Sequence, residues 1–492
     1  MTEFELRFQL PTERAAGVMR ALARGKVTRR RLDAEYYDTT DQALARRGVT
    51  VRLRKEGRRW VQTAKAAGES LLHRLEHSIV VQAAGTARAV PAVNWRLHEG
   101  TPVGDLIAEI LEPRGTQSPP VLHAIYQSKV QRLARIVRVG RTSVEIALDR
   151  GWIEAPGGRA CISELEFELK KGAPEDAIAL ARRWCAMHAC WLSTISKAER
   201  GQRLALHPLA VQARPARAPT PESHSGQDFA KAVLHACLEQ VLANASEVAS
   251  RSTDSEHAHQ VRIGVRRLRT AMREFHALLP QVDAHWDAPW IRLFRELGRQ
   301  RDTLYLEQLQ SRLEAVGGPA LKAGHGDADA VAAVRAASFQ DALLAMLGLV
   351  HGPWEEQGGN ADPKQVKVLL VRRLGRLRKA VLADGREFDR LSTDRQHRVR
   401  KRVKRLRYLS EFSQGFFRGK QVEKFLDRLK PLQDSLGEYN DELLALGRLR
   451  EWADIEPEAW FGAGWLSARQ VCNAAACAKA IRDFGDVRPF WK

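Results

Sequence analysis

The sequence has few cysteines, and they are not arranged as metal or disulfide pairs. They form no Cys-x-x-Cys pair and no His/Cys spacing typical of a zinc site, so we expect free thiols in a reducing compartment. The chain also lacks an apolar run of the roughly 20 residues that a membrane span needs, and a basic-then-apolar leader. These absences favour a cytoplasmic address and no membrane partner. The six cysteines are Cys161, Cys185, Cys190, Cys237, Cys472 and Cys477.

Negative charge is also in short supply. Lys and Arg number 79 against 59 Asp and Glu, which leaves a formal net charge of +20. Such a charge attracts polyanions, including nucleic acid and polyphosphate. Aromatic residues make up only 7% and do not interleave with the basic stretches, so nucleic acid is expected to bind only non-specifically. There is no GxxxxGK[ST] loop, which argues against an ATP-driven motor or a kinase of that type.

The length of 492 residues predicts two or three domains. Residues 207–224 contain Pro208, Pro215, Pro219 and Pro221 among Ala, Arg and Ser, which is typical of an extended linker. We therefore predict a first domain over 1–206 and a second over 225–492.

The two domains differ in hydrophobic period. In the first, polar and apolar residues alternate over 3–8, 51–54, 144–149 and 163–169, which predicts strands, and helical periodicity covers 11–22, 103–111 and 174–188. From about residue 227 the pattern predicts long amphipathic helices almost throughout. Examples are 229–248, 260–279, 336–349, 366–381 and 396–412. The fold class is thus α+β, with a strand-rich first domain and an all-α second domain.

The charged faces of the predicted strands carry both signs. A charged strand face usually lies in solvent, but a closed barrel could turn all these faces inward and form a polar tunnel. Clustered carboxylates would need a neutralising cation, and oxygen-only ligands suit Mg²⁺ or Mn²⁺. The basic side chains would hold a phosphate chain, and together these are the usual equipment for phosphoryl transfer. The charged residues are Glu3, Glu5, Glu164, Glu166, Glu168, Arg52, Arg54, Lys65, Arg74 and Arg132.

The second domain contains a histidine-led basic stripe that occurs twice. His259, Arg262, Arg266 and Arg269 match His397, Arg400, Lys404 and Arg407, and the valines and leucine between them repeat as well. On a helix these cations share one side, which indicates a built anion site. A second repeat follows, in which Leu297-Gly298-x-x-Arg301-Asp302 corresponds to Leu436-Gly437-x-x-Asn440-Asp441. Two similar helical halves are therefore expected. The histidines either donate hydrogen bonds to an anion or pack and cap between the halves.

The first domain resembles the CYTH, or triphosphate tunnel metalloenzyme, family. Glu3-x-Glu5-x-Arg7 is similar to its Glu-x-Glu-x-Lys signature, and Glu164-x-Glu166-x-Glu168 to its closing strand. Several shorter motifs, including Ser196-Lys197-Ala-Glu-Arg200, follow in the family's order. The resemblance implies an eight-stranded antiparallel tunnel that binds inorganic triphosphate and Mg²⁺ or Mn²⁺. It implies metal ligation by Glu3, Glu5, Glu164, Glu166 and Glu168, catalysis by Arg7, Lys65, Arg132 and Lys197, and substrate binding by Arg52, Arg54 and Arg74.

One position departs from the family pattern. Arg7 stands where the signature has lysine. The charge is kept, but a guanidinium is not a compact ammonium group, so turnover is affected more than binding if the lysine orients the reacting phosphate.

The second domain resembles the CHAD family of conserved-histidine helical domains, through both stripes and through the repeat that follows them. The resemblance implies two four-helix bundles related by a pseudo-twofold axis, and binding of inorganic polyphosphate, with association with polyphosphate granules. It implies a phosphate-chain site made of His259, Arg262, Arg266, Arg269, Arg273, His397, Arg400, Lys401, Lys404 and Arg407.

Two functions follow from the sequence. The first is a polyphosphate-binding protein with a metal-dependent inorganic triphosphatase tunnel. The alternative is a granule-associated binding protein whose tunnel is inactive, which the arginine at position 7 favours. Adenylate cyclase or thiamine-triphosphatase chemistry would fit the same tunnel, but no base-binding or thiamine-binding feature is evident. The sequence gives no oligomeric state.

Overall fold

The structure is a computed structural model that describes residues 2–82, 90–112, 120–205, 211–280, 282–283, 285–321, 329–354 and 361–492. Contacts divide it into two compact units. One contains Met1–Arg214, Leu242–His257 and Val334–Pro353, and the other Pro215–Val241, Ala258–Ala333 and Trp354–Lys492. Residues 207–210 of the predicted linker lie outside the described residues, and the predicted boundaries 1–206, 207–224 and 225–492 stay a prediction.

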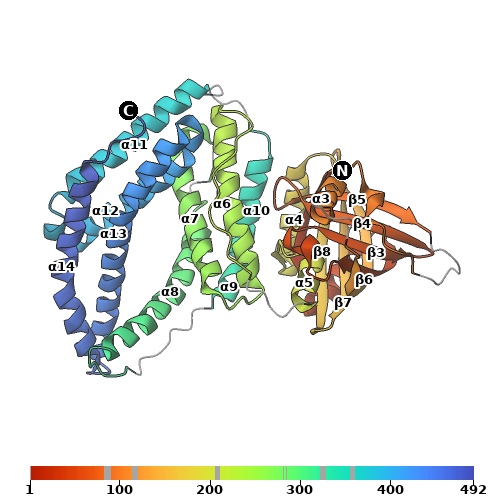
Figure 1. Cartoon of the computed structure of the whole chain (residues 1–492), viewed down its shortest axis with the longest axis horizontal. Helices are drawn as coiled ribbons and strands as arrows, with labels where there is room; N and C mark the ends of the chain where they lie inside the picture. The colour runs from red at the N-terminus through yellow and green to blue at the C-terminus, as the bar shows by residue number, and fades with distance from the viewer. Residues whose placement is uncertain are drawn as a thin grey trace. The chain divides into compact units, whose positions relative to one another are not determined.

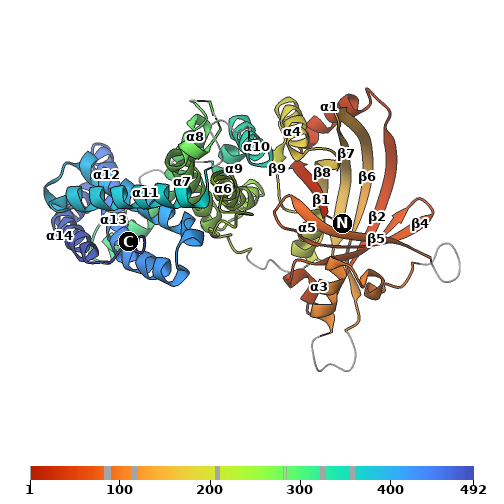
Figure 2. The ribbon, with the colours of Figure 1, turned by 90° about the horizontal axis from the view of Figure 1, so that it is seen from above.

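The first unit is built on a closed antiparallel barrel. Its hydrogen-bonded strand order is β5-β4-β3-β2-β6-β7-β8-β1-β9, and an additional β5–β1 pairing closes the first eight strands into a ring (Figure 2). This confirms the predicted eight-stranded antiparallel tunnel. The strands are β1 Thr2–Gln9, β2 Thr28–Asp38, β3 Thr50–Glu56, β4 Arg59–Ala67, β5 His73–Val81, β6 His123–Val139, β7 Thr142–Ala155, β8 Gly158–Lys171 and β9 Trp191–Leu192.

The register of β1 brings the two acidic segments together. Glu5 lies opposite Glu168, and Arg7 lies opposite Glu166. Because successive side chains alternate between faces, the buried Phe4, Leu6 and Phe8 point to the other side of β1. The barrel therefore has a charged inner face and an apolar outer face.

Helices cover the apolar outer face and reach the inner one. Helix α4 (Pro174–His188) packs on β8, where the ring centroids of Phe167 and Trp184 are 6.1 Å apart. Helix α5 (Lys197–Ala205) lies against β6, β7 and β8, and the Tyr126 hydroxyl donates to the Ala198 carbonyl at 2.8 Å. Gly201 leaves room there, since a Cβ would overlap the Tyr126 ring. The remaining elements are η1 Thr12–Arg14, α1 Ala15–Leu22, α2 Ala43–Arg46, η2 Trp95–His98 and α3 Pro102–Leu111.

A helix from later in the chain also belongs to this unit. Helix α10 (Ala337–His351) packs against α4, and Arg182 binds both carboxylate oxygens of Asp341, at 2.5 and 2.7 Å. The Gln340 side chain accepts the backbone N–H of Leu192 in β9 at 2.9 Å.

The second unit is helical (Figure 1). Each predicted C-terminal helix overlaps an observed helix, including α10 of the first unit. Within the described parts of the chain, no helix is both long and apolar enough to cross a membrane. Three helices are shared with the first unit: α6 Gly226–Ala249, α7 Ser255–Glu274 and α9 Ala330–Arg335. The others are η3 His276–Leu278, α8 Ala288–Glu314, α11 Pro363–Gly385, η4 Phe388–Arg390, α12 Thr393–Phe412, η5 Gln414–Phe416, α13 Gly419–Ala453 and α14 Ala459–Gly485.

The two stripe helices, α7 and α12, exchange ion pairs. Arg267 of α7 pairs with Glu411 of α12, while Arg405 of α12 pairs with Glu274 of α7. Arg267 and Arg405 occupy the same position in the two sequence repeats. Each stripe helix thus pairs its repeat arginine with a glutamate of the other, which agrees with two similar helical halves.

Candidate functional site

The densest ionic network inside the barrel surrounds Lys197, at the start of α5. Its ammonium group lies 2.9 Å from Asp149, 2.8 Å from Glu164 and 2.5 Å from Glu166. Arg132 binds Asp149 at 2.7 Å and also contacts Glu166. Burial alone would lower the pKa of Lys197, but the three carboxylates outweigh it and hold that pKa well above its usual value. The lysine is therefore a fixed cation that joins β7, β8 and α5.

A second network lies where β1 meets β5. Lys65 pairs with Glu76 and lies 3.6 Å from Glu3. Burial raises the pKa of Glu3 to about 7, although Lys65 opposes this, and Glu76 and Glu168 add to the increase. Glu76 shifts the other way: Lys65 and Arg52 outweigh its burial and lower its pKa to about 2. At neutral pH, Glu3 is partly protonated beside ionised Glu76.

Other inner cations lack comparable acidic partners. Burial, followed by the charge of Arg7, lowers the pKa of Arg74 to about 10. Burial and the charge of Arg52 lower that of Arg54 to about 10, although Glu56 contacts it. A phosphate group bound beside Arg54 and Arg74 would offset the cost of burying these cations and reduce their repulsion by neighbouring arginines.

The predicted metal ligands match a divalent cation in donor type and charge. Burial, with smaller contributions from Glu76 and Glu168, raises the pKa of Glu3, and a hard cation would favour its ionised form. Glu164 and Glu166 are instead neutralised by Lys197 and by basic side chains. Among the residues that the structure describes, no group of three or more His, Cys, Asp or Glu side chains is placed to hold a metal ion. The match is therefore one of chemistry and not of preformed geometry.

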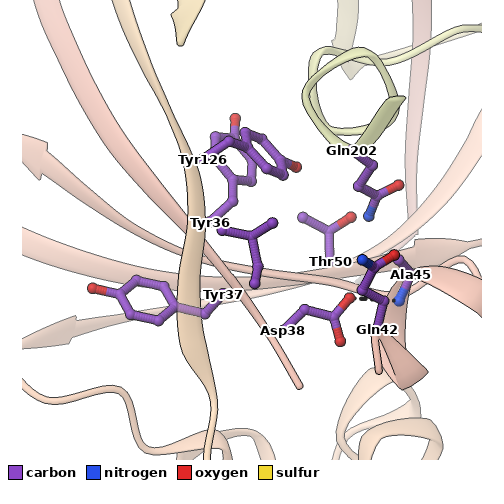
Figure 3. A pocket seen from close by; sticks show the side chains of 9 residues that line it. Tyr36, Tyr37, Asp38, Gln42, Ala45, Thr50, Tyr126 and Gln202 are labelled. Carbon is purple, nitrogen blue, oxygen red and sulfur yellow. Dashed lines mark hydrogen bonds between the residues drawn. The ribbon is translucent and has the colours of Figure 1, made fainter. Parts of the chain in front are cut away.

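A narrow pocket adjoins the charged interior (Figure 3). The rings of Tyr36 and Tyr126 stack there, with centroids 4.5 Å apart and planes 16° apart, and Gln202 of α5 lies beside them. Tyr36 hydrogen-bonds with Arg52 and Ser128. Burial would raise the pKa of Tyr36, but the Arg52 charge and these hydrogen bonds bring it below its usual value. Tyr36 thus places a polar hydroxyl beside Arg52.

In the second unit, basic side chains of α7, α8 and α12 form a cluster that an aspartate of α13 adjoins. We call this the helical cation cluster. Its basic members are Arg262, Arg266, Arg301, Arg400 and Lys404, and the acidic residues near them are Asp302 and Asp441.

Positive charge is in excess within this cluster. Burial, then the charges of Arg266 and Arg400, lower the pKa of Lys404 to about 5, with Asp441 opposing. Burial and neighbouring arginines also lower the pKa of Arg262 to about 10. Arg400 is likewise lowered to about 10, chiefly by burial. Buried charges without enough counter-charge are costly, so the cluster is suited to a multivalent anion.

Gly298 explains part of the sequence motif on α8. A Cβ at this position would lie 2.6 Å from Nη1 of Arg262. That guanidinium donates to the Phe294 carbonyl at 3.0 Å and stacks over the Phe294 ring, 4.4 Å from its centroid. The glycine of the Leu297-Gly298 motif therefore makes room for the first stripe arginine.

Only some residues of the two stripes belong to the helical cation cluster. Arg262, Arg266, Arg400 and Lys404 do. By contrast, Arg269 pairs with Asp287 at 3.2 Å and Arg407 with Glu411 at 2.7 Å. Half-buried His397 contacts Oδ1 of Asn440 at 3.1 Å through Nδ1. The other predicted members, His259, Arg273 and Lys401, are exposed.

The structure adds residues that the sequence-based site omitted. In the barrel these are Asp149, Glu76 and Arg200, the last of which binds Glu164 at 2.6 Å. In the helical unit they are Arg301 and Asp441. Both helical residues belong to the second sequence repeat. Because that repeat follows each stripe, it could have pointed to Arg301 and Asp441 as further site residues.

The molecule thus combines a closed antiparallel barrel that has a charged interior with a helical domain that holds buried cations. Residues 1–202 match the family model of the CYTH domain, and residues 232–450 match that of the CHAD domain. The chain is thus a CYTH domain followed by a CHAD domain.

Individual relatives resemble parts of the chain. An inorganic triphosphatase from Haemophilus influenzae is 29% identical over 172 residues, which are 34% of this chain and 44% of that protein, so the match spans less than half of the relative's length. The CHAD domain from the plant Ricinus communis is 26% identical, covering 57% of this chain and 97% of its own, with a TM-score of 0.42. A putative adenylyl cyclase from Hippeastrum, described as having a dominant triphosphatase activity, is 16% identical, covering 43% and 100%, with a TM-score of 0.31.

Proposed function

We propose that the barrel hydrolyses inorganic triphosphate. The observation that carries this proposal is the charged interior, in which Arg54 and Arg74 lie among carboxylates without full neutralisation, and Arg7 lies opposite Glu166 on the neighbouring strand. Arginine forms paired, charge-assisted hydrogen bonds with phosphate oxygens. The family assignment and the curated triphosphatase relative support the same substrate.

The proposed reaction transfers the terminal phosphoryl group to water. A new P–O bond forms to the water oxygen, the bridging P–O bond breaks, and orthophosphate and diphosphate leave. Arg7, Arg54 and Arg74 bind the phosphate oxygens and stabilise the charge that develops on the leaving diphosphate. Lys197 and Arg132 hold Glu166 in place. When bound to Glu3, Glu5, Glu164, Glu166 and Glu168, Mg²⁺ or Mn²⁺ would supply further charge neutralisation.

We also propose that the helical unit binds inorganic polyphosphate. The excess positive charge of the helical cation cluster favours this function, because a phosphate chain brings several negative charges to one buried site. Granule association belongs to this proposal. The alternative of an inactive tunnel attached to a binding domain differs only in the barrel, where arginine occupies position 7.

Phosphate release by the purified chain tests the first proposal. We expect release from inorganic triphosphate with Mg²⁺ or Mn²⁺, less from ATP, and none in excess chelator. Full activity in chelator would contradict the proposed metal dependence, while no release with any divalent ion would favour the inactive-tunnel alternative. Binding of long-chain polyphosphate, measured in parallel with duplex DNA at equal salt and phosphate, tests the second. Equally tight DNA binding would contradict selectivity for polyphosphate.

A further inference from the structure

One carboxylate lies within the helical cation cluster, in contact with both halves of the repeat. The Asp441 carboxylate accepts a hydrogen bond from Arg301 of α8 at 3.1 Å and lies 3.6 Å from Arg400 of α12. The same oxygen, Oδ1, makes both contacts. An oxygen placed between two guanidinium groups is also what a phosphate group would provide.

Asp302, the other acidic residue near the cluster, makes a different contact. Asp302 pairs with Arg301 at 2.9 Å, but this is a contact between adjacent residues on one helix. Arg262, Arg266 and Lys404 still face an excess of positive charge with both acids present. Asp441 is therefore the carboxylate that links α8 and α12 through Arg301 and Arg400, and it neutralises the positive charge of the cluster only in part.

We propose that Asp441 is an internal competitor of the phosphate chain, which binds the cluster by displacing this carboxylate from Arg301 and Arg400. The inference rests on the proposed polyphosphate binding and adds how the site is regulated. A carboxylate brings one negative charge, whereas a phosphate chain brings one for each unit it places in the cluster, so the exchange favours long chains over single phosphates.

A proton accompanies the exchange. Lys404 faces Arg266 of α7, Arg301 of α8, Arg400 of its own helix and Asp441 of α13. With its pKa near 5 in this surrounding, Lys404 is mostly neutral at neutral pH. Additional negative charge raises the pKa of a buried ammonium group, so Lys404 gains a proton when the chain binds.

The test compares polyphosphate affinity of the full chain with that of Asp441→Asn. We expect binding roughly tenfold tighter in the variant, because the competing charge is gone while the side-chain volume is kept. Asp434→Asn is the matched control, since Asp434 is an exposed residue two turns earlier on α13 and loses the same charge. An Asp441→Asn affinity equal to or weaker than that of the control would overturn the inference.

Calorimetry on the wild-type chain gives a second readout that does not depend on how the variant folds. Titration with long-chain polyphosphate near pH 7.5, in two buffers of different ionisation enthalpy, should show net proton uptake, and Lys404→Met should lose it. Wild-type binding without proton uptake would overturn the proposed protonation of Lys404, whereas displacement of Asp441 is decided by the affinity of Asp441→Asn. Absence of any wild-type binding would instead remove the proposed function, and this inference with it.

Discussion

Lys197 in the barrel and Lys404 in the helical unit are both partly buried, yet their surroundings shift their pKa values in opposite directions. Three carboxylates within 3 Å hold the pKa of Lys197 well above its usual value. Burial and three arginines lower the pKa of Lys404 to about 5. The network around Lys197 neutralises its own cation, whereas the helical cation cluster does so only in part, as do the surroundings of Arg54 and Arg74 in the barrel.

The difference teaches what each region requires from a ligand. In the barrel, cations and carboxylates are interleaved by cross-strand register, so a bound substrate would compete with existing ion pairs. In the helical unit, cations from three helices, α7, α8 and α12, converge on Asp302 and Asp441, so an anion adds neutralisation that the fold leaves incomplete. The first arrangement suits chemistry on a short substrate, and the second suits retention of a long polyanion.

Removal of one barrel carboxylate should give the largest effect. Glu166→Gln leaves Lys197 and Arg132 with less counter-charge in a buried network, so we expect a loss of triphosphatase activity of roughly 100-fold or more. Unfolding free energy should also fall, by roughly 3 kcal/mol. Phosphate release and urea unfolding measure the two effects.

Glu154→Gln serves as the control for that change. Glu154 is on β7, is about half exposed and lies 3.6 Å from Lys129, so its loss should change activity and stability little. Equal effects of the two substitutions would show that the network around Lys197 has no special role.

A double substitution tests polyphosphate binding by the helical cation cluster. Arg266→Gln with Arg400→Gln should weaken polyphosphate binding by roughly 100-fold, since each lost charge-assisted contact costs about tenfold. Lys364→Gln with Arg395→Gln removes the same charge from exposed positions and should cost far less. Binding at several salt concentrations would measure both, and similar losses from the two pairs would contradict a built site.

The two lysines also predict opposite dependence of stability on pH. The unfolded chain protonates Lys404 below its ordinary pKa of 10.5, whereas the folded, ligand-free unit binds that proton only near pH 5. Stability of the helical unit should therefore rise with pH across this window. The contribution of Lys197 is complete below pH 10.5 and is lost only above it.

Thermal unfolding near pH 7.5 and near pH 9 tests whether stability rises with pH because of Lys404. Lys404→Met should remove part of the increase in Tm with pH, whereas Lys401→Met, an exposed change on the same helix, should leave it intact. An unchanged pH dependence in Lys404→Met would show that Lys404 is ionised in the folded state.

The smallest effect is expected at Arg7. It is buried, lies 3.9 Å from Glu5 and donates to the Thr194 carbonyl at 3.3 Å. If its role is mainly electrostatic, Arg7→Lys should keep activity within a few-fold of the parent or raise it, and Arg7→Ala should impair it. An inactive parent that Arg7→Lys activates would favour the inactive-tunnel alternative for the natural chain.

Hydrophobic period predicted part of the fold, namely four strand segments such as 3–8 and the long helices of the second half. The closed eight-stranded barrel was expected from the family resemblance, and the duplicated stripe predicted one cationic face on each of two helices. The partners could not be predicted in the same way, because Asp149 meets Lys197, and Glu76 meets Lys65, only through cross-strand and strand–helix contacts. The stripe also overstated the helical site: Arg269 and Arg407 share a face with Arg262 and Arg400 but lie about 10 Å further along the helix axis, where they pair with Asp287 and Glu411.

The central claim is that one chain holds two separate phosphate sites with different charge compensation. Its most direct test is a crossed measurement of triphosphate hydrolysis and long-chain polyphosphate binding on Glu166→Gln and on Arg266→Gln/Arg400→Gln. The account predicts that the first variant loses hydrolysis and keeps binding, whereas the second loses binding and keeps hydrolysis. Loss of both properties in either folded variant would contradict it.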